Sequence, residues 1–178
     1  MLKDRVDILL GFLLLVCIAS VAALLFGAGS QASQRDMSVD KALERDLAYQ
    51  AKVSYLHRLY APVTELRQSG RFETALMKLD ELSRRYPDEA YGELLRGEIL
   101  LNMQAIPQAI EHLAMAVRMS GDFVDRQSPL SRRSMIDKLL EQQLPKLKTA
   151  AASQGGERMQ ATLKNLYYLQ GRLAGGCE

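Results

Sequence analysis

The chain has no tryptophan, only two cysteines and only two histidines among its 178 residues. Two cysteines cannot build the disulfide framework that small secreted domains use to compensate for a small core. The formal net charge is only +2, and acidic and basic residues are interspersed, so no field of one sign attracts nucleic acid or another polyanion. These absences exclude a disulfide-rich scaffold and argue against a nucleic-acid-binding protein.

The usual signatures of catalytic and metal sites are also missing. His57 and His112 lie far apart, and neither belongs to an HExxH motif, a CxxCH motif or another Cys/His cluster. The chain has no glycine-rich phosphate-binding loop, and its carboxylates stand beside Lys and Arg, as on a solvated helix surface. We therefore expect no catalytic residue, cofactor, metal site or small-molecule substrate. The chain is not expected to be an enzyme.

One long apolar run stands near the amino terminus. Residues 8–27 carry no charge, and a helix of that length, at about 1.5 Å per residue, spans the ~30 Å hydrocarbon core of a bilayer. The run is longer than the roughly 7 to 15 apolar residues of a cleavable export signal. Ser30-Gln31-Ala32 nevertheless fits a cleavage site. An uncleaved signal-anchor over residues 1–29 is the favoured interpretation, and a processed signal is the alternative.

The charges that flank this run indicate its orientation. Lys3 and Arg5 precede it, whereas residues 28–34 carry no charge, and positive residues favour the cytoplasmic side. This pattern predicts a cytoplasmic amino terminus and an exported body. Three basic residues farther along favour the reverse: Arg35, Lys41 and Arg45. The flanking signals resemble those of a bacterial inner-membrane protein with a periplasmic domain.

Two features of the chain concern possible contacts with other chains. Cys17 lies inside it and Cys177 is the penultimate residue, so no bond between them is expected if the run crosses a membrane. The role of Cys177 stays open between pairing with another chain and none at all. Small residues also give the run one side suited to close helix packing. They are Gly11, Ala19, Ser20, Ala22, Ala23 and Gly27.

The rest of the chain has the apolar period of helices. Residues 30–37 are polar and small, which is typical of a short tether. Ser38 fits an N-cap, and a helix is predicted from there to about Ser69. Pro62 lacks an N–H and its ring clashes with the preceding turn, so this helix should kink or restart near Ala61.

A short motif, Gly70-Arg71-Phe72-Glu73-Thr74-Ala75-Leu76, is followed by a similar pattern 34 residues later. Six apolar positions stay apolar across this step. The pairs are Leu66 and Leu100, Phe72 and Ile106, Ala75 and Ala109, Leu76 and Ile110, Leu79 and Leu113, and Leu82 and Ala116. A repeat of this length, with glycine at a turn and a small residue where two helices meet, resembles the tetratricopeptide repeat (TPR), a helix-turn-helix unit.

The second unit departs from that pattern. Gln104 stands where the first unit has Gly70, and Gly121 stands where it has Pro87. We therefore expect the second turn, which begins at Gln104, to be wider than the first. Gly97 does match the glycine in the first helix of the family's repeat.

The resemblance implies an all-α fold: a single N-terminal transmembrane helix, followed by a TPR-like antiparallel helical-hairpin array with flanking capping helices. Stacked repeats expose apolar end faces that such helices cover. The expected segments are an anchor at 1–29, a tether at 30–37, an N-terminal capping helix at 38–61, two repeats over 56–121 and a C-terminal helical cap at 122–178.

In that family, the first helices of successive repeats line a concave groove that receives a peptide or a partner helix. The resemblance carries this role to ten groove residues: His57, Tyr60, Thr64, Arg67, Gln68, Tyr91, Leu94, Glu98, Leu101 and Asn102. Tyr60 and Thr64 stand where the family clamps a terminal carboxylate, which speaks against that ligand. The groove is either open or filled by the chain's own C-terminal helix.

The resulting hypothesis is a non-enzymatic, membrane-tethered protein–protein interaction module. It would act as an accessory or assembly factor of an inner-membrane complex for respiration, cytochrome maturation or secretion. The alternative is a permanent structural subunit whose transmembrane helix packs against partner helices. Both imply protein partners at or in the membrane, membrane contact through residues 8–27 and no nucleic acid. A basic stretch over residues 126–148 leaves a role towards an acidic partner or the membrane surface open.

Overall fold

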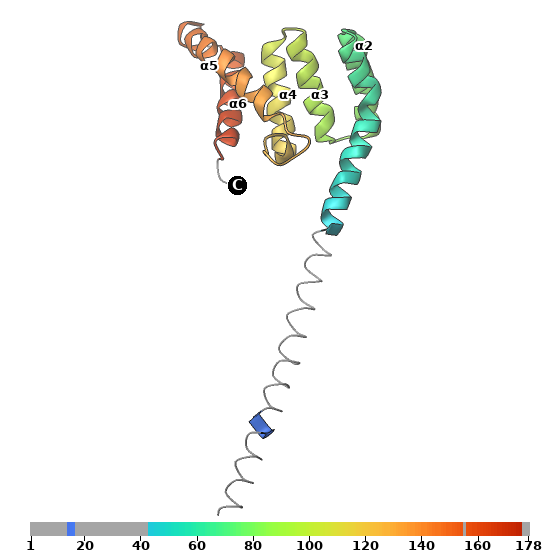
Figure 1. Ribbon diagram of the computed structural model, residues 1–178. Helices are drawn as coiled ribbons and strands as arrows, with labels where there is room; N and C mark the ends of the chain where they lie inside the picture. Colours follow the sequence, from blue (N-terminus) through green and yellow to red (C-terminus); the bar gives the residue numbers. More distant parts are fainter. Residues whose placement is uncertain (1–13, 17–42, 155, 176–178) are drawn as a thin grey trace, which may run out of the picture. The chain divides into compact units, whose positions relative to one another are not determined.

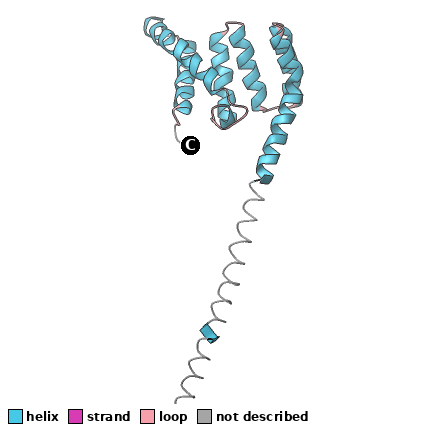
Figure 2. Cartoon of the chain, in the orientation of Figure 1, coloured by secondary structure: helices cyan, strands magenta, loops and turns pink. Residues whose placement is uncertain are grey.

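A computed structural model describes residues 14–16, 43–154 and 156–175, and every regular element in these ranges is a helix (Figure 2). The predicted all-α fold class is thus confirmed for this part of the chain. The chain divides into two compact units, residues 1–52 and residues 53–178.

In the first unit, the structure describes residues 14–16 and 43–52, which are all helical. The three described residues of the apolar run are more than half exposed. No helix among the described residues is both long and apolar enough to cross a bilayer. Most of the predicted anchor, the whole tether at 30–37, the expected N-cap Ser38 and both cysteines lie outside the described residues, so these interpretations stay predictions.

The second unit is a series of helices; short turns join most of them, and a longer connection over residues 120–132 joins α4 to α5 (Figure 1). It begins within a helix that covers residues 43–68. The helices that follow are α2 (Phe72–Arg85), α3 (Ala90–Asn102), α4 (Ile106–Met119), the 3₁₀ turn η1 (Gly121–Phe123), α5 (Arg133–Gln154) and α6 (Glu157–Leu173). Residues 86–89 and 103–105 reverse the chain, so α2, α3 and α4 stand side by side and run in alternating directions.

The helix over residues 43–68 continues through Pro62 without interruption, so it does not restart near Ala61. Tyr60 and Val63, on the two sides of the proline, are only 1% and 0% exposed. Because tertiary packing supplies most of the stability of a helix in a protein, these two buried side chains hold the helical path across the lost hydrogen bond.

Gly70 closes the turn before α2. Its φ is +74°, its N–H donates to the carbonyl of Arg67 at 3.0 Å, and the N–H of Arg71 donates to the carbonyl of Leu66 at 2.9 Å. This pair of bonds is a Schellman ending, which satisfies the last carbonyls of the helix. A β-carbon placed at Gly70 would meet no atom within 4 Å. Backbone conformation alone therefore favours glycine here.

The second turn repeats the first with different residues. Gln104 has a φ of +60°, its N–H donates to the carbonyl of Leu101 at 3.0 Å, and the N–H of Ala105 donates to the carbonyl of Leu100 at 2.9 Å. The expectation of a wider turn at Gln104 is therefore wrong. The same two hydrogen bonds close it, and the glutamine adopts a left-handed conformation that costs a side-chain-bearing residue free energy.

Three further backbone hydrogen bonds recur at the same offset. All six donor–acceptor distances lie between 2.8 and 3.0 Å. Each pair is a bond and its equivalent 34 residues later: Ser69 to Glu65 and Met103 to Ile99, Ala75 to Arg71 and Ala109 to Ala105, and Tyr86 to Leu82 and Ser120 to Ala116. The repeat seen in the side-chain pattern thus extends to the backbone of both turns and both helix ends.

Small residues let the helices of the second hairpin approach closely. A β-carbon at Gly97 would lie 2.7 Å from Cγ and 3.2 Å from the backbone nitrogen of Leu113, closer than atoms normally come. Leu113 and Ala109, on the facing side of α4, are fully buried. The α3–α4 contact therefore depends on the missing side chain at Gly97.

The last two helices extend the unit beyond the second hairpin. α6 packs against both α4 and α5, and Leu166 and Leu169 on α6 are fully buried. On the outer side, Arg118 of α4 donates from Nη2 to Oδ1 of Asn165 at 2.6 Å and lies 4.7 Å above the ring of Tyr168. α6 therefore covers one side of α4.

Candidate functional site

The ten groove residues fall into three groups by exposure. The exposed ones are His57, Gln68 and Asn102, and the half-buried ones are Thr64, Arg67 and Leu101. The buried ones are Tyr60, Tyr91, Leu94 and Glu98. The predicted surface therefore has a solvent-facing part and a floor that belongs to the core of the second unit. The partner-binding role of these residues stays a prediction.

An aromatic cluster forms part of this floor. The rings of Tyr60 and Tyr91 meet edge to face with centroids 5.4 Å apart, and His57 lies 5.9 Å from Tyr91 on the exposed side. Phe123 from η1 lies 6.4 Å from Tyr91 on another side. A β-carbon at Gly92 would come within 3.0 Å of the Tyr60 hydroxyl, so this glycine leaves room for the ring. The cluster joins the 43–68 helix, α3 and η1.

Burial keeps the two central phenols neutral. Burial raises the pKa of Tyr60 to about 12, with a smaller contribution from nearby carboxylates, led by that of Glu89. Burial also raises the pKa of Tyr91, although the neighbouring Arg132 opposes the shift. Both phenols therefore stay neutral near neutral pH, and their rings pack within the core of the second unit.

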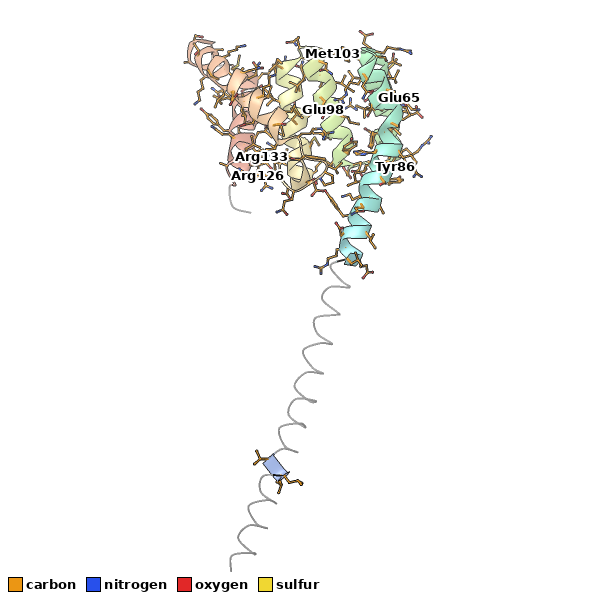
Figure 3. All side chains as sticks on the ribbon, in the orientation of Figure 1. Glu65, Tyr86, Glu98, Met103, Arg126 and Arg133 are labelled. Atoms are coloured by element: carbon orange, nitrogen blue, oxygen red, sulfur yellow. The ribbon has the colours of Figure 1, made fainter. Side chains whose placement is uncertain are left out.

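A buried carboxylate lies at the other end of the floor. Glu98 is 7% exposed and accepts from two arginines: Arg67 Nη1 bonds to its Oε2, and Arg132 Nε bonds to its Oε1 at 2.7 Å. Arg132 also donates from Nη1 to the carbonyl of Ser131 at 3.2 Å. Two guanidinium groups thus compensate the buried charge. The bridge links the 43–68 helix and α3 to the residue that precedes α5; Figure 3 labels Glu98 on α3.

The connection between α4 and α5 covers part of the predicted groove. Phe123 contacts the ring of Tyr91, and Arg132 bonds to Glu98. Neither covering residue was predicted from the repeat, because this connection has no helical period and does not follow the 34-residue offset. The one signal it offered is the apolar pair Phe123-Val124 in an otherwise polar segment. Apolar residues within a loop indicate that the loop packs on the core.

Two short polar contacts join α2, α3 and α4. His112 Nδ1 on α4 lies 2.6 Å from Oε2 of Glu93 on α3, and Arg96 Nη2 lies 2.6 Å from Oδ1 of Asp80 on α2. The hydrogen bond with His112 holds the pKa of Glu93 below its usual range, although partial burial opposes the shift. His112 is thus placed as a structural partner of a carboxylate, while His57 is exposed. The described part of the chain contains no group of three or more His, Cys, Asp or Glu suited to a metal ion.

Comparisons with protein-family models, with curated proteins and with solved structures found no match to this chain. The likeness to the tetratricopeptide repeat therefore rests on the chain's own 34-residue offset in apolar positions and turn hydrogen bonds.

Proposed function

We propose that this chain is a non-enzymatic, membrane-tethered protein–protein interaction module that serves an inner-membrane complex as an accessory or assembly factor. The observation that carries the proposal is the 34-residue repeat, which is present in the turn hydrogen bonds as well as in the apolar positions. Stacked helical hairpins of the tetratricopeptide type offer an extended helical side suited to a partner polypeptide.

The proposed contact surface is the solvent-facing part of the groove residues. His57 marks one end and Gln68 and Asn102 mark the other, with half-buried Thr64, Arg67 and Leu101 between or beside them. The buried rings and the Glu98 bridge support this surface from below and hold it rigid. A partner would meet mostly polar side chains on a fixed base, as at the rim of a non-obligate interface.

Tethering is the proposed mechanism. The uncharged run of residues 8–27 supports a membrane anchor, with a cytoplasmic amino terminus and the helical domain that follows the anchor in the periplasm of a bacterium. A partner confined to the same membrane then meets the surface at a far higher effective concentration than in free solution. Even a modest affinity suffices under these conditions.

Site-specific photocrosslinking in intact membranes tests the surface. A photoreactive amino acid is placed at His57 or at Asn102, which are both exposed, and at Lys164 on the exposed side of α6 as a matched control. We expect the first two positions to capture the same membrane-associated polypeptide and Lys164 to capture none of it. Equal capture at all three positions, or capture at none, would contradict the proposal.

The permanent structural subunit remains the second candidate, because small residues such as Gly11 and Ala19 give the apolar run a side suited to helix packing. Stoichiometric co-purification with other membrane chains after detergent extraction, unaffected by changes at His57 and Asn102, favours this candidate. Recovery of a partner in substoichiometric amounts, abolished by changes at His57 and Asn102, favours the accessory factor.

A further inference from the structure

An open hollow of about 830 Å³ lies where three segments of the second unit meet. Its lining comes from residues 121–127, from the first residue of α5 and from residues 172–175 at the end of α6. Figure 3 labels Arg126 and Arg133 beside each other at this end of the unit. The hollow lies outside the groove residues and takes no part in the function proposed above.

Three arginines line this hollow, one from each segment: Arg126, Arg133 and Arg172. Arg133 is held in place because its Nη1 donates to the carbonyl of Val124 at 3.3 Å and its Nη2 donates to the carbonyl of Leu173. Arg126 is exposed and takes part in no ion pair of the described residues.

One nitrogen of Arg172, its buried Nε, lacks a hydrogen-bond partner among the described residues. A β-carbon at Gly121 would lie 3.2 Å from its Nη2, so the guanidinium packs against the backbone at the rim of the hollow. A buried charged donor without an acceptor is costly. Because this Nε is itself buried, the donors that Arg172 offers to the hollow are those of its terminal nitrogens.

The charge of the lining favours an anion. Asp122 and Asp125 also line the hollow, so three positive charges face two negative ones. The carboxylate of Asp125 accepts from the backbone N–H of Gln127 at 2.9 Å, which directs it towards its own loop. None of the three arginines forms an ion pair among the described residues. A group with several acceptor oxygens satisfies donors from three directions better than a planar carboxylate does.

We propose that this hollow binds a phosphate group through Arg126, Arg133 and Arg172. The phosphate belongs either to a soluble phosphorylated compound or to the headgroup of an anionic phospholipid, and the same chemistry recognises both. The proposal stands independently of the partner surface, because no groove residue lines the hollow.

Calorimetric titration of the full-length chain with inorganic phosphate tests the site. The protein is held in nanodiscs of phosphatidylcholine, and chloride keeps the ionic strength constant. We expect a dissociation constant of about 1 mM or tighter. R172Q should weaken binding about tenfold and R126Q several-fold, because each removes charge-assisted donors. R84Q makes the same charge change at an exposed position of α2 and should leave binding unchanged.

Arg126 is exposed, so R126Q keeps the test decisive even if R172Q fails to fold, which circular dichroism reveals. No binding heat for the wild type, or equal affinities for the R126Q and R84Q variants, overturns the proposal. Nanodiscs that contain phosphatidylglycerol then distinguish the two sources. If phosphatidylglycerol weakens phosphate binding and R126Q removes this competition, the natural ligand is a lipid headgroup. If phosphate binding is undiminished in these nanodiscs, the natural ligand is soluble. Either result supports the site.

Discussion

The two hairpins of the second unit share a backbone and differ in chemistry. Gly70 and Gln104 close their turns with the same two hydrogen bonds, and the positions of Thr64 and Glu98 are equivalent. The first hairpin has a favourable turn residue and a neutral side chain at these places. The second has a strained turn residue and a buried charge. The backbone geometry of the turns is thus the same in both hairpins, although the residues that stabilise it differ. The second hairpin relies on contacts from outside the repeat.

Removal of the Glu98 carboxylate should show the largest contrast between the hairpins. E98A leaves Arg67 and Arg132 close together without their shared partner, and we expect a loss of about 3 kcal/mol in the free energy of unfolding. The equivalent T64A removes only a hydroxyl bonded to the carbonyl of Tyr60 at 3.2 Å, and should cost less than about 1 kcal/mol. Urea unfolding followed by circular dichroism measures both. Similar losses for the two variants would show that the bridge contributes little.

The close helix contact at Gly97 gives the next prediction. G97A forces a methyl group against Leu113 and should destabilise the protein by about 1–3 kcal/mol. Gly171 is the matched control, because it lies in α6 and a β-carbon there meets nothing within 4 Å. G171A should stabilise the protein by about 0.5–1 kcal/mol, as expected for an unstrained helical glycine. Opposite signs in thermal or urea unfolding confirm the contact, and a stabilising G97A would refute it.

Exchanging the turn residues tests the shared backbone directly. Q104G relieves a left-handed glutamine and should stabilise the protein by about 1 kcal/mol, whereas G70Q should destabilise it by a similar amount. The two substitutions exchange the same two residue types in opposite directions, so their effects on the free energy of unfolding should add to about zero. If Q104G destabilised the protein, the glutamine side chain would have a stabilising contact that outweighs the backbone strain.

The smallest effect concerns pH. The pKa of Glu93 is lower in the folded protein than in the unfolded chain, so its contribution to stability is complete above the unfolded value. That contribution is lost as the pH falls through the folded value. Because the pair is partly exposed, we expect the loss to be under about 1 kcal/mol. The equivalent position in the first hairpin is Leu59, which cannot titrate. E93Q should therefore flatten the acid limb of the stability profile, and an unchanged limb would contradict this.

The repeat was predictable because it depends on spacing. Ala75 and Ala109 are both fully buried, and the six apolar pairs follow from equivalent helices of the two hairpins that bury equivalent faces. The turn at Gln104 was predicted wrongly because the prediction rested on the residue type, whereas two backbone hydrogen bonds close the turn. Hydrogen bonding decides such an ending, and glycine only makes it less costly.

The floor of the groove was the least predictable part. Tyr60, Tyr91, Leu94 and Glu98 were predicted to line the groove, yet they are buried. Their burial depends partly on Phe123 and Arg132, which come from a connection without periodicity. Contacts of that kind join residues far apart in sequence, and apart from the apolar pair Phe123-Val124 no local pattern indicates them. The anchor lies mostly outside the described residues and is still argued from hydropathy alone.

The bridge at Glu98 also bears on how the unit comes apart. Arrays of repeats usually unfold in stages, because each repeat contacts only its neighbours. Here one carboxylate holds an arginine from before the first turn and an arginine that directly precedes α5, so both hairpins and the start of the last helix pair share a single tie. Unfolding of either hairpin must break it. The unit should therefore melt as one cooperative block, despite an architecture that ordinarily allows piecewise loss.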